Sequence, residues 1–449
     1  MASAAEQLAS NINLGTFGKA TELKQRILFT LLALIVYRLG TYIPVPGIDP
    51  TVLEEFFQQQ SRGVLGMVDI FAGGALSRMT IFALSIMPYI SSSIIVQLMT
   101  AVVPQLESMK KEGEAGRAKL NQYTRYLTVI LALIQSYALA TGLEHMMGPS
   151  GPAVIETGLL FRFTTTATLT AGTMFLMWLG EQITSRGIGN GTSLIIFSSI
   201  VASIPISIAN ALELGRTGAL SAGVIILLII IIIAVIYFVV FMERAQRRVL
   251  VQYPKRQVGN KVYGGEASHL PLKLNSSGVI PAIFSSSLLL LPLTAIGFLG
   301  ADASSPWAQW ISQHLGHGSP LFMFLYAALI IFFSFFYTAV VFNPKDTADN
   351  LKKYGGFIPG IRPGNNTADY LDHILTRLTV LGAIYMAIVC LLPEFLTAEF
   401  SIPFYFGGTS LLIVVSVTMD TVARIQSQLL AHQYEGLIKK ANLKGKRDR

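Results

Sequence analysis

The side chains that most often perform catalysis are few and scattered in this sequence of 449 residues. The six histidines form no cluster. The single cysteine, Cys390, lies in an apolar run without a second cysteine, which excludes a disulfide framework and a cysteine-based metal site. The patterns GxxxxGK(S/T), HExxH and GxSxG are all missing. The sequence therefore predicts a protein that is not an enzyme, with no catalytic residue, no metal and no cofactor.

Ionisable side chains are also nearly missing from the long apolar segments of the chain. A secondary transporter or an ion channel places such groups at membrane depth to bind its coupling ions. Here the polar groups within the apolar segments are amides and hydroxyls, such as those of Gln97 and Gln135. This absence argues against ion coupling and leaves a polymer-conducting path or a membrane scaffold. One function that a chain with such segments could have, that of an inverted-repeat solute transporter, is disfavoured because it would also need such ionisable groups.

The composition excludes an ordinary soluble protein. Only 13% of the residues are charged and 52% are hydrophobic, with a net charge of +8. Soluble domains carry about 25% charged residues. A chain of this length with half that share cannot cover a water-facing surface, so most of its exterior must face lipid.

Ten apolar segments are long enough to cross a bilayer, whose hydrocarbon core requires about 20 helical residues. The segment from Gly223 to Phe241 contains no charge at all. The sequence therefore predicts an all-α integral membrane protein with ten transmembrane helices. The predicted spans are 25–43, 76–101, 123–143, 159–180, 192–211, 220–242, 277–299, 320–342, 375–393 and 405–429.

The basic residues fix the orientation of these spans. Of the 33 lysines and arginines, only five arginines lie in the connections and span ends on one side, which leaves 33 − 5 = 28 on the other. The side rich in basic residues also holds both ends of the chain. Because basic residues concentrate in cytoplasmic loops, both termini are expected to be cytoplasmic.

Ten spans divide into two halves of five around a short polar link. An odd number of spans per half makes the second half enter the membrane in the opposite sense, which is the topology of an inverted repeat with a path between its halves. The predicted parts are an N-terminal cytoplasmic segment, the first half, the link, the second half and a cytoplasmic tail. They cover 1–24, 25–211, 212–219, 220–429 and 430–449.

The first outward loop, from Pro44 to Arg78, is larger than a connection requires. Its segment SRGVLGMVDIFAGGALSR has an apolar core that is too short to span, glycines on both sides and Asp69 in the middle. We predict a short helix on glycine hinges. From these residues alone the helix could enter a cavity between the halves or pack on the outer surface.

Two cytoplasmic loops, 243–274 and 343–374, are long and basic. In the first, RRVLVQY and KRQVGNKVY are predicted to pair as a β-hairpin that stands off the membrane. The second carries Arg362 among prolines and glycines, which predict a stiff, exposed tip. Loops this long are more often functional than connecting. A basic protruding face suits an acidic or nucleic-acid-rich partner, or anionic lipid.

Several segments in order along the chain resemble one family of membrane proteins. The chain is similar in them to the bacterial SecY family, the channel subunits of the Sec protein translocon, and the resemblance extends from about Lys19 to Gly445. The segments are SRGVLGMVDIFAGGALSRMTIFALSIMPYISSSIIVQL, KKEGEAGRAKLNQYTRY, GTMFLMWLGEQITSRGIGNGTS, VIPAIF, VFNPKDTADNLKKYGGFIPGIRPG and PFYFGGTSLLIVV.

The resemblance implies a clamshell of two halves around an hourglass-shaped pore. Its waist would be a ring of six mostly aliphatic side chains. Matched motif by motif, the ring residues are Ile86, Ile90, Thr192, Ile196, Ile283 and Ile413. Ile86 and Ile90 are four residues apart, and so are Thr192 and Ile196. Each pair therefore lies on one face of a helix, as residues that line a pore must. A narrow apolar collar disfavours water and ions yet offers a sliding polypeptide nothing specific to bind.

Thr192 departs from the aliphatic pattern of this ring. We expect its hydroxyl to bond back to the carbonyl of Ile188, with its methyl group facing the pore. The waist of this chain would then be slightly more wettable than an all-aliphatic ring.

The resemblance also implies a plug that closes the waist from outside, and a lateral gate through which apolar segments reach lipid. The plug residues would be Leu65, Gly66, Met67, Val68, Asp69, Ile70, Phe71, Ala72, Gly73 and Gly74. The candidate polar residues of the lateral gate are Ser91, Gln97, Gln135 and Asn275. Hydrogen bonds between helices in membranes are worth only about 0.6 kcal/mol on average, so an arriving apolar helix could outcompete a few of them.

The implied function is a protein-conducting channel that moves unfolded preproteins across the membrane and releases hydrophobic segments sideways into it. The implied partners are SecE and SecG subunits, the SecA motor ATPase, a translating ribosome, signal sequences and preproteins, with anionic lipid beside the basic loops. Arg362, Arg256 and Lys261 are the implied contacts with motor and ribosome. The expected location is the bacterial plasma (inner) membrane, crossed many times.

Overall fold

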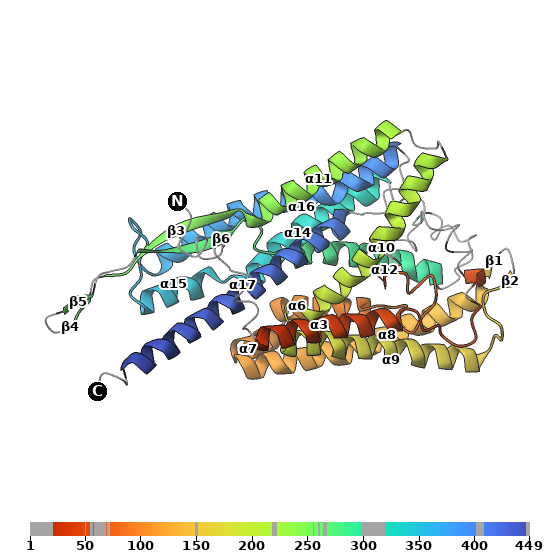
Figure 1. Ribbon diagram of the computed structural model, residues 1–449, viewed down its shortest axis with the longest axis horizontal. Helices are drawn as coiled ribbons and strands as arrows, with labels where there is room; N and C mark the ends of the chain where they lie inside the picture. Colours follow the sequence, from red (N-terminus) through yellow and green to blue (C-terminus); the bar gives the residue numbers. More distant parts are fainter. Residues whose placement is uncertain are drawn as a thin grey trace.

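Long α-helices dominate the structure of the chain (Figure 1). This computed structural model describes residues 21–445 except 50, 54–56, 58–68, 70–71, 149–150, 218–221, 255, 259–260, 264–266, 299–309, 311–313, 315–318 and 401–407.

Within the described residues, ten long helices take the places of the ten predicted spans, although their ends differ from the predicted ones. In the first half they are α3 (Thr21–Gly40), α6 (Met87–Val102), α8 (Glu114–His145), α9 (Leu159–Arg186) and α10 (Gly191–Arg216). In the second half they are α11 (Ala222–Arg244), α12 (Ile280–Phe298), α14 (Pro320–Val341), α16 (Asn365–Phe400) and α17 (Gly408–Gly445).

Not every one of these helices is apolar enough to be recognised as a span by itself. Among the described helices, six are long and apolar enough to cross a membrane, or seven if α6 and the short α7 (Pro104–Lys111) form one span bent by 99°. Over a membrane-spanning length, helix α9 is less apolar than these helices because it is rich in threonine. Its buried face includes Thr165, Thr173 and Leu176, which pack against protein. A helix surrounded by other helices does not need an apolar surface on every side.

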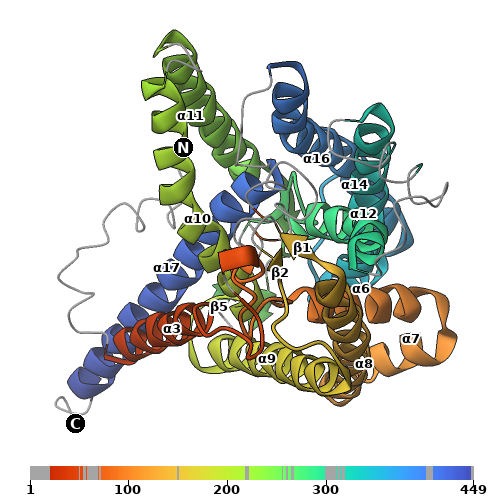
Figure 2. The same cartoon turned by 90° about the vertical axis from the view of Figure 1, so that its right-hand side faces the viewer.

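The helices form two groups that meet along α12 (Figures 1 and 2). One group holds α3, α6, α8 and α9, with α8 packed against both α6 and α9. The other holds α11, α12, α14 and α16, with α14 packed against both α12 and α16. Helix α12 also lies against α6 and α8, so the two groups touch there. Helices α10 and α17 pack against each other and complete the contact between the groups.

The start of the second predicted span, 76–101, is wrong. Helix α6 begins only at Met87, and residues 76–86 run as turns and one β-bridge residue. Met79 and Ser85 have positive φ angles of 44° and 51°. L-residues in this conformation cannot continue a right-handed helix, so the apolar composition of the segment overstates its helix.

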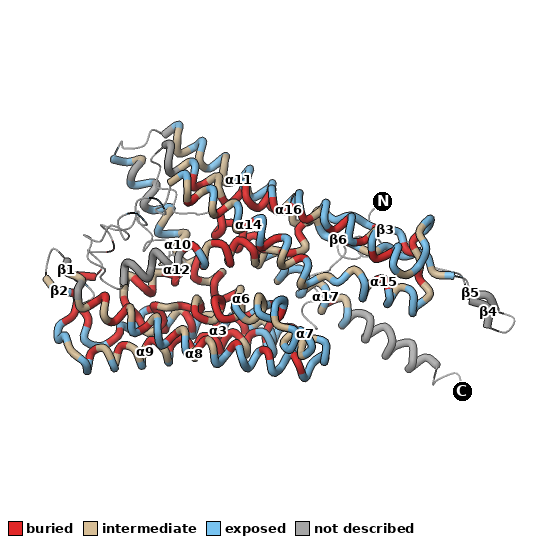
Figure 3. Tube along the Cα trace, turned by 180° about the vertical axis from the view of Figure 1, so that it is seen from behind, coloured by how far each residue is buried: buried red, intermediate tan, exposed pale blue. Residues whose placement is uncertain are grey.

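The main apolar core lies between the two groups of helices. It takes buried side chains from both, including Ile86 and Leu176 from the first half and Ile330 and Leu412 from the second. Buried residues cluster in the interior of the molecule, and exposed ones follow the outward faces (Figure 3). The outward faces are themselves apolar, as on α11, where Ile229 is 51% exposed. Such a surface is suited to lipid rather than to water.

The predicted pairing in the first basic loop is also wrong. Strand β3 (Gln246–Gln252) pairs in antiparallel fashion with β6 (Ala267–Lys273), not with the KRQVGNKVY segment. That segment folds on itself as a small separate hairpin of β4 (Arg256–Val258) and β5 (Lys261–Tyr263). Only two residues separate these strands, which suits a tight hairpin connection. A third pair, β1 (Met147–Gly148) and β2 (Gly151–Pro152), lies at the other end of the molecule (Figure 1).

Candidate functional site

Four isoleucines of the predicted ring close around one small void between the halves. Ile86 is the N-cap residue of α6 and Ile90 lies in the first turn of that helix, while Ile196 comes from α10 and Ile283 from α12. The void measures about 10 Å³, which is room for a single water molecule. Ser85, Ser286 and Ser287 also line the void, so its walls are mostly but not wholly apolar. Three helices that are far apart in the sequence therefore meet here in a nearly closed constriction.

The other two ring candidates, Ile413 and Thr192, are not among the residues that line this void. Ile413 of α17 is fully buried in the same apolar core as Ile86, Ile90 and Ile196. Thr192 instead lines a larger cavity of about 640 Å³, together with Ile90, Ile196 and Ile283. The structure thus brings the five isoleucines into one core and places the threonine on the adjoining cavity wall.

The expected hydrogen bond of Thr192 is wrong. Its hydroxyl donates to Oδ1 of Asn190 at 2.6 Å, not to the carbonyl of Ile188. Asn190 is the N-cap of α10, and its Oδ1 also accepts the backbone N–H of Thr192 at 3.1 Å. Because the helix starts at Gly191, Ile188 lies before its first turn. A back-bond of the kind made inside helices is therefore not available to Thr192.

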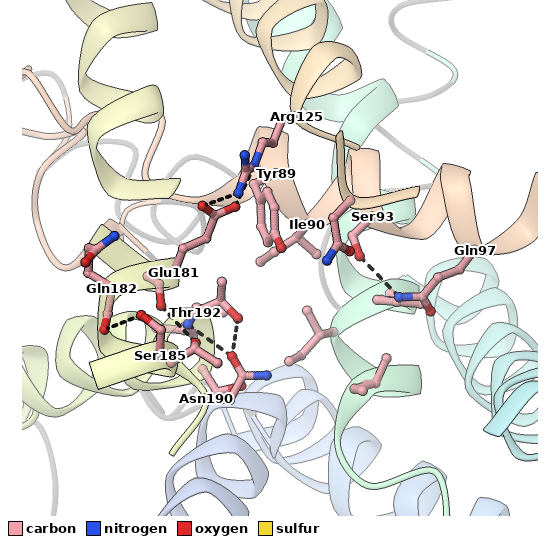
Figure 4. A pocket seen from close by; sticks show the side chains of 18 of the residues that line it. Tyr89, Ile90, Ser93, Gln97, Arg125, Glu181, Gln182, Ser185, Asn190 and Thr192 are labelled. Carbon is pink, nitrogen blue, oxygen red and sulfur yellow. Dashed lines mark hydrogen bonds and ion pairs between the residues drawn. The ribbon is translucent and has the colours of Figure 1, made fainter. Parts of the chain in front are cut away.

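The larger cavity has one polar wall and one apolar wall (Figure 4). On the polar wall, Arg125 of α8 bonds Glu181 of α9 through two contacts of 2.8 and 2.7 Å. The apolar wall includes Phe284 of α12 and Tyr337 of α14. The sequence offered a signal for the ion pair, because opposite charges end two neighbouring spans on the same side. Sequence reasoning nevertheless missed it.

The four candidate residues of the lateral gate are spread over three elements. Ser91 and Gln97 lie on α6, Gln135 lies on α8, and Asn275 lies just before α12. The Gln97 amide donates to Ser93 one turn earlier at 3.2 Å. Its Oε1 is buried and has no hydrogen-bond partner within the described part of the chain.

Asn275 is held by its own neighbourhood rather than by α6. Its Nδ2 donates to Glu243 at the end of α11, at 2.7 Å, and to the carbonyl of Gly278 at 3.0 Å. Its Oδ1 accepts from Ser277 at 2.9 Å. Tyr385 of α16 also donates to Glu243, at 3.3 Å. Asn275 therefore ties the base of the β3–β6 ribbon to α11 and α12.

The described part of the predicted plug is its C-terminal end. Leu65, Gly66, Met67, Val68, Ile70 and Phe71 lie outside the described residues, whereas Asp69, Ala72, Gly73 and Gly74 are described. Asp69 and Ala72 are helical, as predicted. Oδ1 of Asp69 accepts the backbone N–H groups of Leu76 and Ser77 at 3.0 and 2.9 Å, which fixes the turn that follows.

Side chains from α3 and α10 hold this end of the plug in place. Tyr37 donates to the carbonyl of Ala72 at 3.4 Å and bonds Ser199 of α10 at 2.5 Å. Arg38 donates to the carbonyl of Gly73 at 3.2 Å. Sequence reasoning missed these anchors, because only the tertiary fold brings residues so far apart together.

The two basic loops form one unit around a small apolar core. Val251 of β3, Ile358 of the second loop and Leu371 of α16 are all buried in it. A β-bridge between Gln252 and Phe357 joins the loops directly. The two basic loops, which were predicted as separate features, therefore share one apolar core.

The tip of the second loop is exposed, as predicted. Arg362 is exposed, and its carbonyl accepts a hydrogen bond from the Thr367 hydroxyl at 3.0 Å. Gly360 and Gly364 flank it with φ angles of +83° and +107°, which favour glycine. Arg256 and Lys261 lie in β4 and β5, beyond the β3–β6 ribbon. Within the described residues, no group of three His, Cys, Asp or Glu side chains could hold a metal ion.

Comparison with known proteins gives consistent results. A model of the SecY family matches residues 80–422. The protein translocase subunit SecY of Rickettsia conorii is 55% identical over 423 residues, covering 94% of this chain and 97% of the relative. The SecY subunit of Escherichia coli K12 is 55% identical over 428 residues, covering 95% and 96%.

Solved structures share the fold at lower identity. The structure of a protein-conducting channel aligns with a TM-score of 0.62 at 18% identity, covering 90% of this chain and 92% of that chain. Sec61 in the canine ribosome-channel complex aligns with a TM-score of 0.59 at 17% identity, covering 90% and 92%. The family match and the relatives at 55% identity decide the assignment: this chain belongs to the SecY family.

Proposed function

We propose that this chain is the channel subunit of a Sec protein translocase, which conducts unfolded preproteins across the membrane and releases hydrophobic segments sideways into it. The observation that carries this proposal is the constriction between the halves. Isoleucines from α6, α10 and α12 leave a void of about 10 Å³ beside a cavity of about 640 Å³. A cavity that narrows to an apolar constriction suits a path that is closed to ions until a polypeptide widens it.

The six ring positions form the waist of this path, and residues 65–74 form its plug. Apolar side chains at a narrow waist exclude water and ions, and they bind no particular residue of a moving chain. The anchors from Tyr37 and Arg38 to the carbonyls of Ala72 and Gly73 support a plug that rests against the first half. The channel hydrolyses nothing itself. The energy for transport comes from its partners or from the proton gradient.

The lateral gate lies between α6 and α8 of the first half and α12 and α14 of the second. Gln97 and Tyr337 line the same cavity from opposite sides of this boundary. The buried Oε1 of Gln97 is available to a hydrogen-bond donor of an arriving segment. Ser91, Gln135 and Asn275 are the further polar candidates along this boundary.

The partners are inferred from the exposed, basic loops 243–274 and 343–374 at one end of the molecule. A motor ATPase such as SecA, or a translating ribosome, engages Arg362 and the β4–β5 tip with Arg256 and Lys261. One structural relative is a channel in a complex with a ribosome. SecE and SecG complete the channel across the exposed apolar helix faces, and anionic lipid faces the basic loops.

The membrane is the bacterial plasma (inner) membrane, with both termini in the cytoplasm. The excess of Lys and Arg in alternate connections supports this orientation. The rival function, an inverted-repeat solute transporter, receives no support from the relatives, which are translocase subunits and protein-conducting channels.

Arg362→Glu tests the function and the motor contact together. Membrane vesicles carrying the chain with its partner subunits are supplied with the motor ATPase, ATP and a preprotein, and the measured quantity is preprotein protected from added protease. Vesicles with the parent chain are expected to protect it. Arg362→Glu is expected to abolish protection, because it reverses the charge of an exposed loop tip, while the amount of channel in the membrane stays unchanged.

Lys353→Glu is the matched control, because Lys353 is an exposed cation in the last turn of α15 (Pro344–Lys353), on the same loop but away from its tip. It is expected to retain most protection. Normal protection by Arg362→Glu would refute the motor contact. Absence of protection by the parent chain, with the partner subunits and motor shown to be active, would refute the function.

A further inference from the structure

The last turn of α14 contains a carbonyl that the sequence leaves without a helical partner. In a continuing helix, the carbonyl of Val340 would accept the N–H of residue 344, but that residue is Pro344 and has no N–H. Helix α14 ends at Val341, and Asn343 caps the next helix, α15, by accepting the N–H of Lys345. The exposed end of a helix carries such carbonyls and attracts cations.

The missing donor comes from the other half of the molecule. Lys110 of α7 donates from Nζ to the carbonyl of Val340 at 3.1 Å, and both residues are partly buried. Lys110 reaches this position because α7 turns away from α6 by 99° after Val103. On a straight continuation of α6, residue 110 would lie about two turns further along the axis of that helix.

This contact crosses the boundary where the two halves face each other. Tyr337, one turn before Val340 on α14, lines the cavity of about 640 Å³ opposite Ile90 and Gln97 of α6. Helix α14 then leads through Asn343 into α15 and the loop that carries Arg362. Movement of that loop can therefore be transmitted to the carbonyl that Lys110 binds.

We infer that Lys110 is a positioning residue that holds the lateral gate closed at its loop end. The ammonium group joins α7 to the end of α14, so α6 and α14 cannot separate there until this hydrogen bond breaks. An arriving apolar segment, or a partner that shifts α15, would break it. This inference rests on the proposed channel function and adds a specific closing contact to it.

The neighbouring lysine provides a matched control. Lys111 lies on the same short helix but pairs with Glu107, one turn earlier, at 2.8 Å, and its side chain is 74% exposed. That hydrogen bond, with a smaller contribution from Asp346 of α15, raises the pKa of Lys111. Removing Lys111 thus deletes the same charge from the same helix without deleting the contact with α14.

The test uses the full chain with its partner subunits in vesicles and two substrates. One is a normal preprotein, and the other has a signal segment of reduced hydrophobicity, which opens a closed gate poorly. Lys110→Ala is expected to raise transport of the second substrate about three- to tenfold, the range for losing one hydrogen bond between helices, and to leave the first unchanged. Lys110→Arg can still donate to the carbonyl, so the ratio of transport of the second substrate to transport of the first is expected to equal that of the parent chain. Lys111→Ala is expected to change neither.

Two results would overturn the inference. One is an unchanged ratio of the two substrates in Lys110→Ala at equal amounts of channel in the membrane. The other is an equal rise in Lys111→Ala, which would point to charge alone. Loss of transport of both substrates in Lys110→Ala would assign Lys110 to folding or to a partner contact, and so would also overturn it. Failure of the parent chain to transport the normal preprotein would refute the proposed function instead.

Discussion

Single residues at the waist differ in what surrounds each side chain. Ile86 is fully buried and Ile196 nearly so, and both face the void of about 10 Å³. Thr192, one turn before Ile196 on the same helix, lines the larger cavity, and its hydroxyl is already bonded to Asn190. The family motif could identify these positions from the sequence. It could not give the hydrogen bond of Thr192, because that depends on where α10 begins.

This difference predicts unequal effects on ion leakage. Ile196→Ser places a hydroxyl in the closed void and is expected to raise the ion conductance of resting vesicles severalfold, because a polar group favours water in a narrow apolar passage. Thr192→Ile removes a hydroxyl that Asn190 already holds, so it is expected to lower the conductance only slightly. Conductance changes of equal size and opposite sign in the two variants would contradict the assignment of the waist. An unchanged conductance in Ile196→Ser would also contradict it.

The sequence predicted which segments form helices better than it predicted where the helices begin and which strands pair. Ten apolar segments identified ten helices, since length and hydropathy are local properties. The start of α6 was wrong because positive φ angles at Met79 and Ser85 end the helix within an apolar run. The partner of β3 was wrong because β6 follows it at a distance, and a small apolar core with the second loop selects that pairing.

The C-terminal hinge of the plug depends on Gly73. Gly73 has a φ angle of +68°, and an added Cβ would lie 2.9 Å from Nη1 of Arg38 and 3.0 Å from Cα of Ser199. Gly73→Ala therefore combines a backbone cost of about 1–2 kcal/mol with displacement of its anchors. We expect it to loosen the plug and to raise the resting ion conductance of vesicles severalfold.

Gly151→Ala serves as the control for Gly73→Ala. Gly151 also has a positive φ angle, of +137°, but an added Cβ would meet nothing within 4 Å. It carries backbone strain without touching the plug, and we expect parent-like conductance. Similar conductance in the two variants would mean that the contacts with Arg38 and Ser199 do not hold the plug.

In the whole molecule, two groups of helices enclose the constriction, and the loop unit of the second half lies at one end (Figure 1). The count of ten spans and the distribution of basic residues could be read from the sequence, because both follow from the requirements of a bilayer. The contacts between the halves could not be read from the sequence. The bond from Lys110 to Val340 joins residues 230 positions apart, and only the bend between α6 and α7 brings them together.

Site-specific crosslinking of a preprotein stalled in membranes tests the proposed polypeptide path most directly. Single cysteines are placed at Ile86, Ile196 or Ile413, and at Ile229 on the outward face of α11 as the control, in a chain carrying Cys390→Ser. We expect crosslinks from the waist positions and none from Ile229, because the polypeptide passes between the halves. Equal crosslinking at Ile229, or none at the waist, would contradict the proposed path.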